Sequence, residues 1–272
     1  MPIQYVLDPY VDAALSSLFH ENPATLLPQK IEDIEKLTLR WIFSAFVTYA
    51  SEARKIFALS PDDVQDISED ITLETFGRFV GYPAEARVWS KVDFKRSQWV
   101  CLPDNLVRQA LLVDTKAEKG AVSNARLQIG QTSMQIRQIN GSGDPIEERG
   151  ALPECMNLEG KLYLTTTILI AYHYADEIDP IYRNVEDVTR IPNNRILKEI
   201  IFSAIPNGLL QEKYNPSIDD GIWNVGPHSP ARGEEFRTRL SFSKLKRKAP
   251  WRVQKISWPN PSGASISARW SD

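Results

Sequence analysis

Cysteine and histidine are scarce in this chain of 272 residues, and their scarcity excludes several kinds of site. Cys101 and Cys155 belong to no Cys-x-x-Cys pair or Cys/His cluster, so neither a disulfide framework nor a structural zinc site is expected. The three histidines, His20, His173 and His228, do not supply the parts of a Ser/His/Asp triad or a histidine-metal nuclease. His173 lies in an apolar run, which indicates a histidine of the core or of a strand.

Long apolar runs and glycine-rich cofactor motifs are also missing. No apolar run approaches the roughly 18 residues that span a bilayer. The N-terminus lacks the features of a signal peptide, so we expect a cytoplasmic protein with no membrane partner. The absence of GxxxxGK(S/T), GxGxxG and GxSxG excludes a nucleotide motor, a dinucleotide site and a hydrolase of the nucleophile-elbow type.

Charge is unevenly distributed along the chain. The formal net charge is only -3, yet residues 1–80 carry -7 and residues 232–255 carry +7. A local basic field suits a polyanionic partner such as DNA, and a solvated basic face that balances the acidic half is the alternative.

Apolar periodicity predicts the main elements. Apolar residues recur at three- and four-residue steps over 30–59, which predicts a long amphipathic helix. We expect the polar run 61–70 to end it and a shorter helix to follow at 71–79. Strands are predicted at 161–177, 236–245 and 248–258, and 196–210 is either a strand or a helix. This order indicates an α/β or α+β fold built on a mixed sheet.

Two β-rich runs flank the sequence LPDN at 102–105, where Pro followed by Asp favours a tight turn. A hairpin centred on the bond between Pro103 and Asp104 pairs residues whose numbers sum to 207, and it places Asp93 opposite Asp114. Opposed residues share a face with Cβ atoms about 5 Å apart, close enough for two carboxylates to hold one divalent ion. The expectation depends on the register, because a slip of one residue separates the carboxylates.

Lys116 adds a third charged group to this predicted site. It lies two positions after Asp114, so on a strand both side chains point to the same face. Carboxylates that bind Mg²⁺ and a lysine that positions water or stabilises the transition state are what phosphodiester hydrolysis requires. We therefore expect Asp93, Asp114 and Lys116 to be catalytic and Asp93, Asp114 and the backbone oxygen of Thr115 to bind the metal. A structural ion pair is the alternative, since Asp/Glu-x-Lys also occurs at 93–95 and 159–161.

Residues 228–239 contain groups that read DNA. Arg237 and Arg239 share one face of a predicted strand, and arginine fits the O6 and N7 edge of guanine bidentately. His228, Ser229 and Arg232 lie just before this strand and offer further edge contacts. A basic surface strand is the alternative reading.

These segments together resemble the SfiI-like type II restriction endonucleases of the PD-(D/E)XK superfamily, and more distantly the BglI enzymes. The resemblance includes HSPARGE, a long and specific match, and the spacing between the two aspartates. The matching segments are 35–40 (EKLTLR), 69–72 (EDIT), 93–96 (DFKR), 111–117 (LLVDTKA), 213–216 (KYNP), 228–234 (HSPARGE) and 250–252 (PWR).

The resemblance implies one restriction-endonuclease-like α/β domain over residues 1–272. Its mixed central sheet would be flanked by helices and followed by a β-rich C-terminal recognition region. It implies metal binding by Asp93 and Asp114, catalysis by Lys116, and base reading by Arg237 and Arg239. Residues 117–160 match poorly, and Asn124 and Arg126 are candidates for DNA contacts there.

The activity implied is Mg²⁺-dependent hydrolysis of both strands of double-stranded DNA at an interrupted palindrome of the GGCC-N5-GGCC kind, leaving 3′ overhangs. The implied partners are DNA, further copies of the chain in a homotetramer that bridges two sites, and a separate methyltransferase that protects the host. A nonspecific repair or recombination nuclease and a non-catalytic DNA-binding protein are the alternatives.

Overall fold

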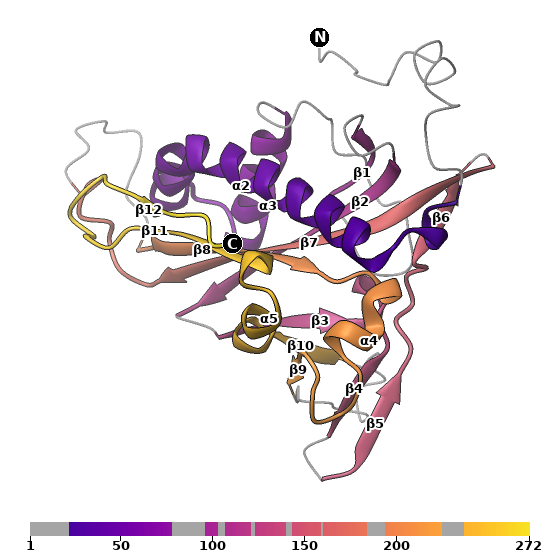
Figure 1. The fold of residues 1–272 in the computed structure, drawn as a ribbon. Helices are drawn as coiled ribbons and strands as arrows, with labels where there is room; N and C mark the ends of the chain where they lie inside the picture. The colour runs from indigo at the N-terminus through magenta and orange to yellow at the C-terminus, as the bar shows by residue number, and fades with distance from the viewer. Residues whose placement is uncertain are drawn as a thin grey trace, which may run out of the picture.

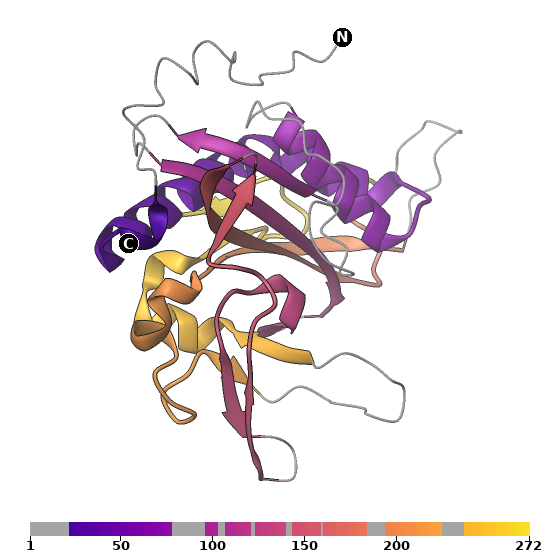
Figure 2. The same cartoon turned by 90° about the vertical axis from the view of Figure 1, so that its right-hand side faces the viewer.

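A central sheet has long helices on one side and two small sheets on the other (Figures 1 and 2). The structure is a computed structural model that describes residues 22–77, 96–102, 107–120, 123–139, 143–158, 160–183, 194–224 and 237–272. For residues 96–102, 158 and 237 only the backbone is described.

The central sheet is mixed, as predicted. Its order is β1-β2-β7-β8-β11-β12, and β6 also pairs with β7. The strands β2 and β7 are parallel, whereas the other neighbouring strands are antiparallel. The bounds are β1 (Arg96–Leu102), β2 (Val107–Lys119), β6 (Cys155–Leu158), β7 (Lys161–Ala175), β8 (Ile196–Ile205), β11 (Val253–Ser257) and β12 (Ser267–Ala268). The segment that sequence left open between strand and helix is therefore a strand, β8.

Two helices cover one face of this sheet (Figure 1). The helix α2 (Pro28–Leu59) starts with a proline in its first turn, buries an apolar stripe against β8, and confirms the predicted long helix. The helix α3 (Val64–Thr75) packs on β2. The predicted start of this helix at residue 71 is wrong, because most of the polar run 61–70 belongs to α3. The Asp63 side chain accepts the N–H of Gln65 at 2.9 Å and so caps the helix.

The small sheets lie on the opposite side, below the central sheet in Figure 1. One has the order β3-β10-β9 and the other pairs β4 with β5. The bounds are β3 (Asn124–Gln128), β4 (Ile136–Ile139), β5 (Pro145–Glu148), β9 (Trp223–Asn224) and β10 (Arg237–Ser241). The remaining short elements are η2 (Pro23–Thr25), η5 (Ile129–Gln131), η6 (Gly208–Leu210), α4 (Gln211–Tyr214), α5 (Phe242–Lys248) and η8 (Pro250–Arg252).

The strand predicted over 236–245 ends earlier than expected. Beyond β10 the chain turns into α5, and the Ser241 hydroxyl accepts the N–H of Lys244 at 3.4 Å as an N-terminal cap. A serine cap stabilises the first turn of a helix, which alternating polarity alone does not reveal. No helix in the described ranges is long and apolar enough to cross a membrane.

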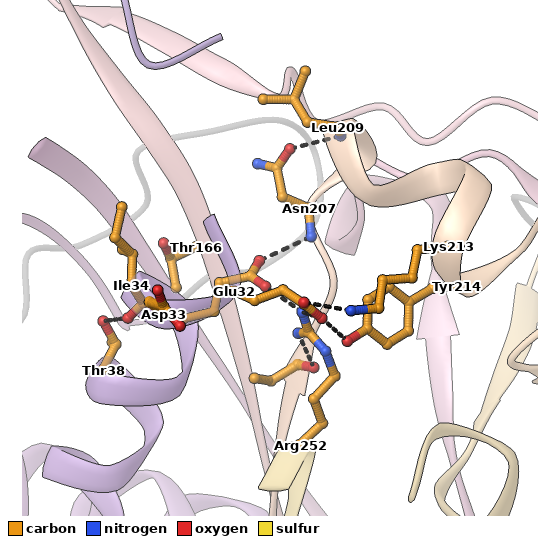
Figure 3. A network of polar contacts seen from close by, with 12 residues as sticks. Glu32, Asp33, Ile34, Thr38, Thr166, Asn207, Leu209, Lys213, Tyr214 and Arg252 are labelled. Atoms are coloured by element: carbon orange, nitrogen blue, oxygen red, sulfur yellow. Dashed lines mark hydrogen bonds and ion pairs between the residues drawn. The ribbon is translucent and has the colours of Figure 1, made fainter. Parts of the chain in front are cut away.

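Arg252 is the centre of a buried polar network (Figure 3). Its Nη2 lies 2.6 Å from Oε2 of Glu35, and the backbone N–H of Asn207 donates to the other oxygen of Glu35 at 2.9 Å. The guanidinium also lies 4.3 Å from the ring centroids of Tyr214 and Trp251. Both charged side chains are fully buried, so each offsets the cost of burying the other's charge.

The same network extends from α2 to the small sheets. Glu32 accepts a hydrogen bond from the Tyr214 hydroxyl and pairs with Lys213 (Figure 3). The next residue, Asn215, donates from its side chain to the carbonyl of Gln135 at 2.7 Å, just before β4. Three segments that carry the resemblance, 35–40, 213–216 and 250–252, thus meet in one structural network.

Candidate active site and DNA-reading surface

Asp114 and Lys116 lie near the C-terminal end of β2 on one face of the sheet. Lys116 Nζ is 3.1 Å from Asp114 Oδ1 and 2.9 Å from Oδ2. The carboxylate is buried and the lysine side chain is 26% exposed, so the ammonium group lies nearer to solvent. The predicted extended strand and the shared face of the two side chains are confirmed.

Asp114 is an electrostatically strained group. Burial raises the pKa of its carboxyl, the Lys116 ammonium partly offsets that effect, and the nearby Glu69 carboxylate raises the pKa further. Oδ2 is buried and lies 2.9 Å from the Lys116 ammonium, with no other hydrogen-bond donor to it among the described residues. A buried carboxylate with few hydrogen-bond donors and a second carboxylate nearby is suited to a cation.

The backbone of Thr115, which the sequence suggests as a metal ligand, contacts α3. Its carbonyl oxygen accepts a hydrogen bond from Gln65 Nε2 at 3.1 Å. Its hydroxyl lies 3.4 Å from the hydroxyl of Thr72, which is 2.9 Å from the hydroxyl of Tyr172. Because side chains alternate along a strand, Thr115 points toward the helices while Asp114 and Lys116 point toward the small sheets.

The β1–β2 hairpin forms, but its register differs from the prediction. Arg96 pairs with Val113 and Leu102 with Val107, so paired numbers sum to 209 rather than 207. The expected placement of Asp93 opposite Asp114 therefore rests on a register that these strands do not have. The error arises from placing the centre of symmetry on the Pro103–Asp104 bond. Asp93 itself lies outside the described residues.

A cavity of about 520 Å³ opens beside Lys116. Lys116 lines it together with Asn124, Arg126 and Arg239, which sequence reasoning placed in separate segments. The first comes from β2, the next two from β3 and the last from β10, so the packing of the small sheet against the end of β2 brings them together. Gln128 and Gln131 also line the cavity, and no sequence motif indicated them.

Two arginines are directly opposed at this cavity. Arg126 on β3 pairs with Arg239 on β10, and Arg239 Nε is buried without a hydrogen-bond partner in the described part of the chain. Like charges opposite one another on a sheet are destabilising. The arrangement is therefore suited to an anionic partner that lies across both strands.

Several predicted DNA contacts cannot be placed. Arg237 pairs through its backbone with Gln128, but its side chain is outside the description, and His228, Ser229 and Arg232 lie outside the described residues. His173 is the core histidine that sequence indicates, since it is buried and its Nδ1 lies 2.9 Å from Glu199. Among the residues that the structure describes, no three His, Cys, Asp or Glu side chains form a metal cluster.

Sequence reasoning missed two residues of α3 at this site. Glu69 affects the electrostatics of Asp114, and Gln65 contacts the backbone on both sides of Lys116. Gln65 and Glu69 are four residues apart, a spacing that places both on one face of a helix. From sequence alone this spacing was not recognised as helical, because the polar run 61–70 was expected to end a helix.

Solved structures of restriction endonucleases share this fold. The crystal structure of tetrameric restriction endonuclease SfiI bound to cognate DNA aligns with a TM-score of 0.77, covering 93% of each chain at 30% identity. The restriction endonuclease BglI bound to its DNA recognition sequence aligns with a TM-score of 0.65, covering 85% of this chain and 91% of that chain. At 16% identity the second likeness concerns the fold alone. The fold class is that of the restriction endonucleases, as predicted.

The sequence comparisons identify the family. A family model described as type II restriction enzyme SfiI matches residues 46–256. The type II restriction enzyme SfiI of Streptomyces fimbriatus is 34% identical over an alignment of 262 residues, and the match covers 93% of each chain. The chain belongs to the SfiI family of type II restriction enzymes, and the predicted resemblance is confirmed.

Proposed function

We propose that this chain hydrolyses both strands of double-stranded DNA at an interrupted G/C-rich palindrome of the GGCC-N5-GGCC kind. The reaction depends on Mg²⁺ and leaves 3′ overhangs. The observation that supports this most directly is the single cavity lined by Lys116, Arg126 and Arg239. A site-specific nuclease requires a catalytic group and base-reading groups that can contact the same bound duplex.

The oxygen atoms at the end of β2 are suited to binding magnesium, which prefers oxygen ligands. Asp114 offers a buried carboxylate, and both of its oxygens lie within 3.1 Å of the Lys116 ammonium. Asp93 and the carbonyl of Thr115 are the further proposed ligands, and Glu69 adds negative charge nearby. When bound, the ion supplies positive charge that stabilises the transition state and makes a water more acidic.

Lys116 acts on the reacting groups. Hydrolysis adds water across the bond between phosphorus and a sugar oxygen, and that oxygen leaves with a proton. The ammonium, held by its two contacts with Asp114, positions the attacking water or stabilises negative charge on the phosphate. We therefore keep Asp93, Asp114 and Lys116 as the proposed catalytic residues.

Base reading is proposed for the small sheet and the segment before β10. Arg239 lines the cavity, and arginine donors match the acceptor edge of guanine in the major groove. Arg126 and Asn124 lie on the neighbouring strand β3. The proposed DNA contacts are Asn124, Arg126, His228, Ser229, Arg232, Arg237 and Arg239.

The proposed assembly follows from the relative. SfiI bound to DNA is a tetramer, and we extend this to a homotetramer, a dimer of dimers, that bridges two DNA sites. A separate methyltransferase would protect host DNA. A single domain over residues 1–272 and a cytoplasmic location remain predictions.

Plasmids with none, one or two GGCC-N5-GGCC sites test the function. The purified chain is incubated with each plasmid and either Mg²⁺ or Ca²⁺. Discrete fragments from site-bearing plasmids with Mg²⁺ support the proposal. A smear from every plasmid identifies a nonspecific nuclease, and retention without cutting in Mg²⁺ identifies a DNA-binding protein. If two-site plasmids are cut no faster than one-site plasmids, the tetramer proposal fails.

A further inference from the structure

The outer edge of β2 has an unusual partner where the proposed catalytic residues lie. Among the described residues, β1 pairs with β2 only as far as Val113. Beyond that point the side-chain amide of Gln65 takes the place of a strand neighbour. Its Nε2 donates to the carbonyl of Thr115 at 3.1 Å, and its Oε1 accepts the N–H of Ala117 at 3.3 Å. These two bonds fix the backbone immediately before and after Lys116.

The same amide also holds a carboxylate. Gln65 Nε2 donates to Glu69 Oε1 at 2.8 Å, one helical turn further along α3. Both hydrogens of the amide nitrogen and its oxygen are therefore used. The orientation is fixed by the partners, because a flipped amide would set its oxygen against two acceptors and its nitrogen against the N–H of Ala117.

We propose that Gln65 is a positioning residue that fixes Glu69 and the Asp114–Lys116 segment relative to one another and so sets the affinity of the site for its divalent ion. The inference rests on the proposed metal-dependent function. Gln65 contacts the carbonyl of Thr115, a proposed ligand, and the carboxylate of Glu69, which adds negative charge beside Asp114. Partners of this kind fix the direction of a ligand without touching the ion, and their loss costs about 10–100-fold in metal affinity or activity.

Gln65→Met removes the amide while keeping the length of the side chain. The matched control is Gln29→Met, since Gln29 Nε2 donates to Asp33 at 3.0 Å over the same four-residue spacing, at an exposed position of α2. The thermal unfolding midpoint of each DNA-free protein is measured against Ca²⁺ and Mg²⁺ concentration, which gives an apparent dissociation constant without any cleavage. We expect Gln65→Met to raise that constant at least tenfold, and Gln29→Met to leave it unchanged.

Two further variants keep the test decisive. Gln65→Asn retains an amide, but its side chain is one methylene too short to reach β2. It should weaken ion binding as Gln65→Met does, and it replaces Gln65→Met in the test if the methionine variant fails to fold. A purely structural role would lower the metal-free midpoint and leave the ion dependence within twofold of the wild type, and that result overturns the inference. Asp114→Asn distinguishes failure of the Gln65 inference from failure of the proposed metal site. If this variant keeps the ion dependence of the wild type, the metal site itself is refuted.

Discussion

Replacing Arg252 with methionine should destabilise the protein by about 3–5 kcal/mol, the usual cost of leaving one partner of a buried ion pair alone. Arg252 and Glu35 are both fully buried, and Nη2 and Oε2 are 2.6 Å apart. The substitution also removes the Nη1 donor to the carbonyl of Ala204 and the packing between the Tyr214 and Trp251 rings. Glu35 would keep only the backbone N–H of Asn207 as a described donor.

The assay is urea unfolding followed by tryptophan fluorescence, with Lys198→Met as the matched control. Lys198 pairs with Glu177 at 2.8 Å, but the two side chains are 36% and 63% exposed. Such surface pairs contribute about 0–1 kcal/mol. Adding Glu35→Gln to Arg252→Met should recover part of the loss, because no unpaired charge then stays buried at that position. The reasoning is refuted if Arg252→Met costs no more than Lys198→Met.

Three further outcomes follow from the site. Burial holds the pKa of the Asp114 carboxyl above its ordinary value near 3.8, so the metal-free folded state binds the carboxyl proton more tightly than the unfolded state does. The free energy of unfolding therefore falls as the pH rises from 3.8 through the raised pKa. At pH 8 without divalent ions, Asp114→Asn should therefore unfold at a higher urea concentration than the wild type. The difference should disappear below pH 3.8, and Mg²⁺ should not stabilise the variant. A lower urea midpoint than the wild type at pH 8 contradicts this. Arg239→Ala should weaken cognate binding in Ca²⁺ by about 1–3 kcal/mol, whereas Arg40→Ala on the helical side should not change it; equal losses on cognate and unrelated duplexes would mean that Arg239 reads no base. Arg126→Gln should raise the urea midpoint of the DNA-free protein, because it relieves repulsion from Arg239, and reduce DNA affinity; a lower midpoint argues against that repulsion.

Local patterns were sufficient for the main helix and for the long strands β2 and β7 of the central sheet. The apolar stripe of α2 and the apolar runs of β2 and β7 are long, and such signals leave little doubt about element type. The start of α3 was missed because a run of aspartates looks like a loop, although Asp63 caps a helix there. A loop and the start of a helix can be distinguished here only when the face of α3 that is buried against β2 is known.

The site was predicted in parts and assembled only by tertiary structure. The pair Asp114 and Lys116 follows from strand alternation, so sequence gives it directly. The hairpin register depends on how the turn closes, and an error of two in the paired sum moves every predicted partner of β2. The meeting of Lys116 with Arg239 depends on the small sheet packing near the end of β2, and no local pattern encodes that contact.

Cleavage of a two-site plasmid by three variants tests the central claim most directly. Asp114→Ala and Lys116→Ala should each abolish cutting in Mg²⁺, while Lys161→Ala, from another Asp/Glu-x-Lys tripeptide, should cut like the wild type. Lys116 lies beside Ala171 on β7, ten residues from Lys161 and so roughly 33 Å away along the strand. Wild-type cleavage by Asp114→Ala or Lys116→Ala would contradict the assignment of the active site to the end of β2.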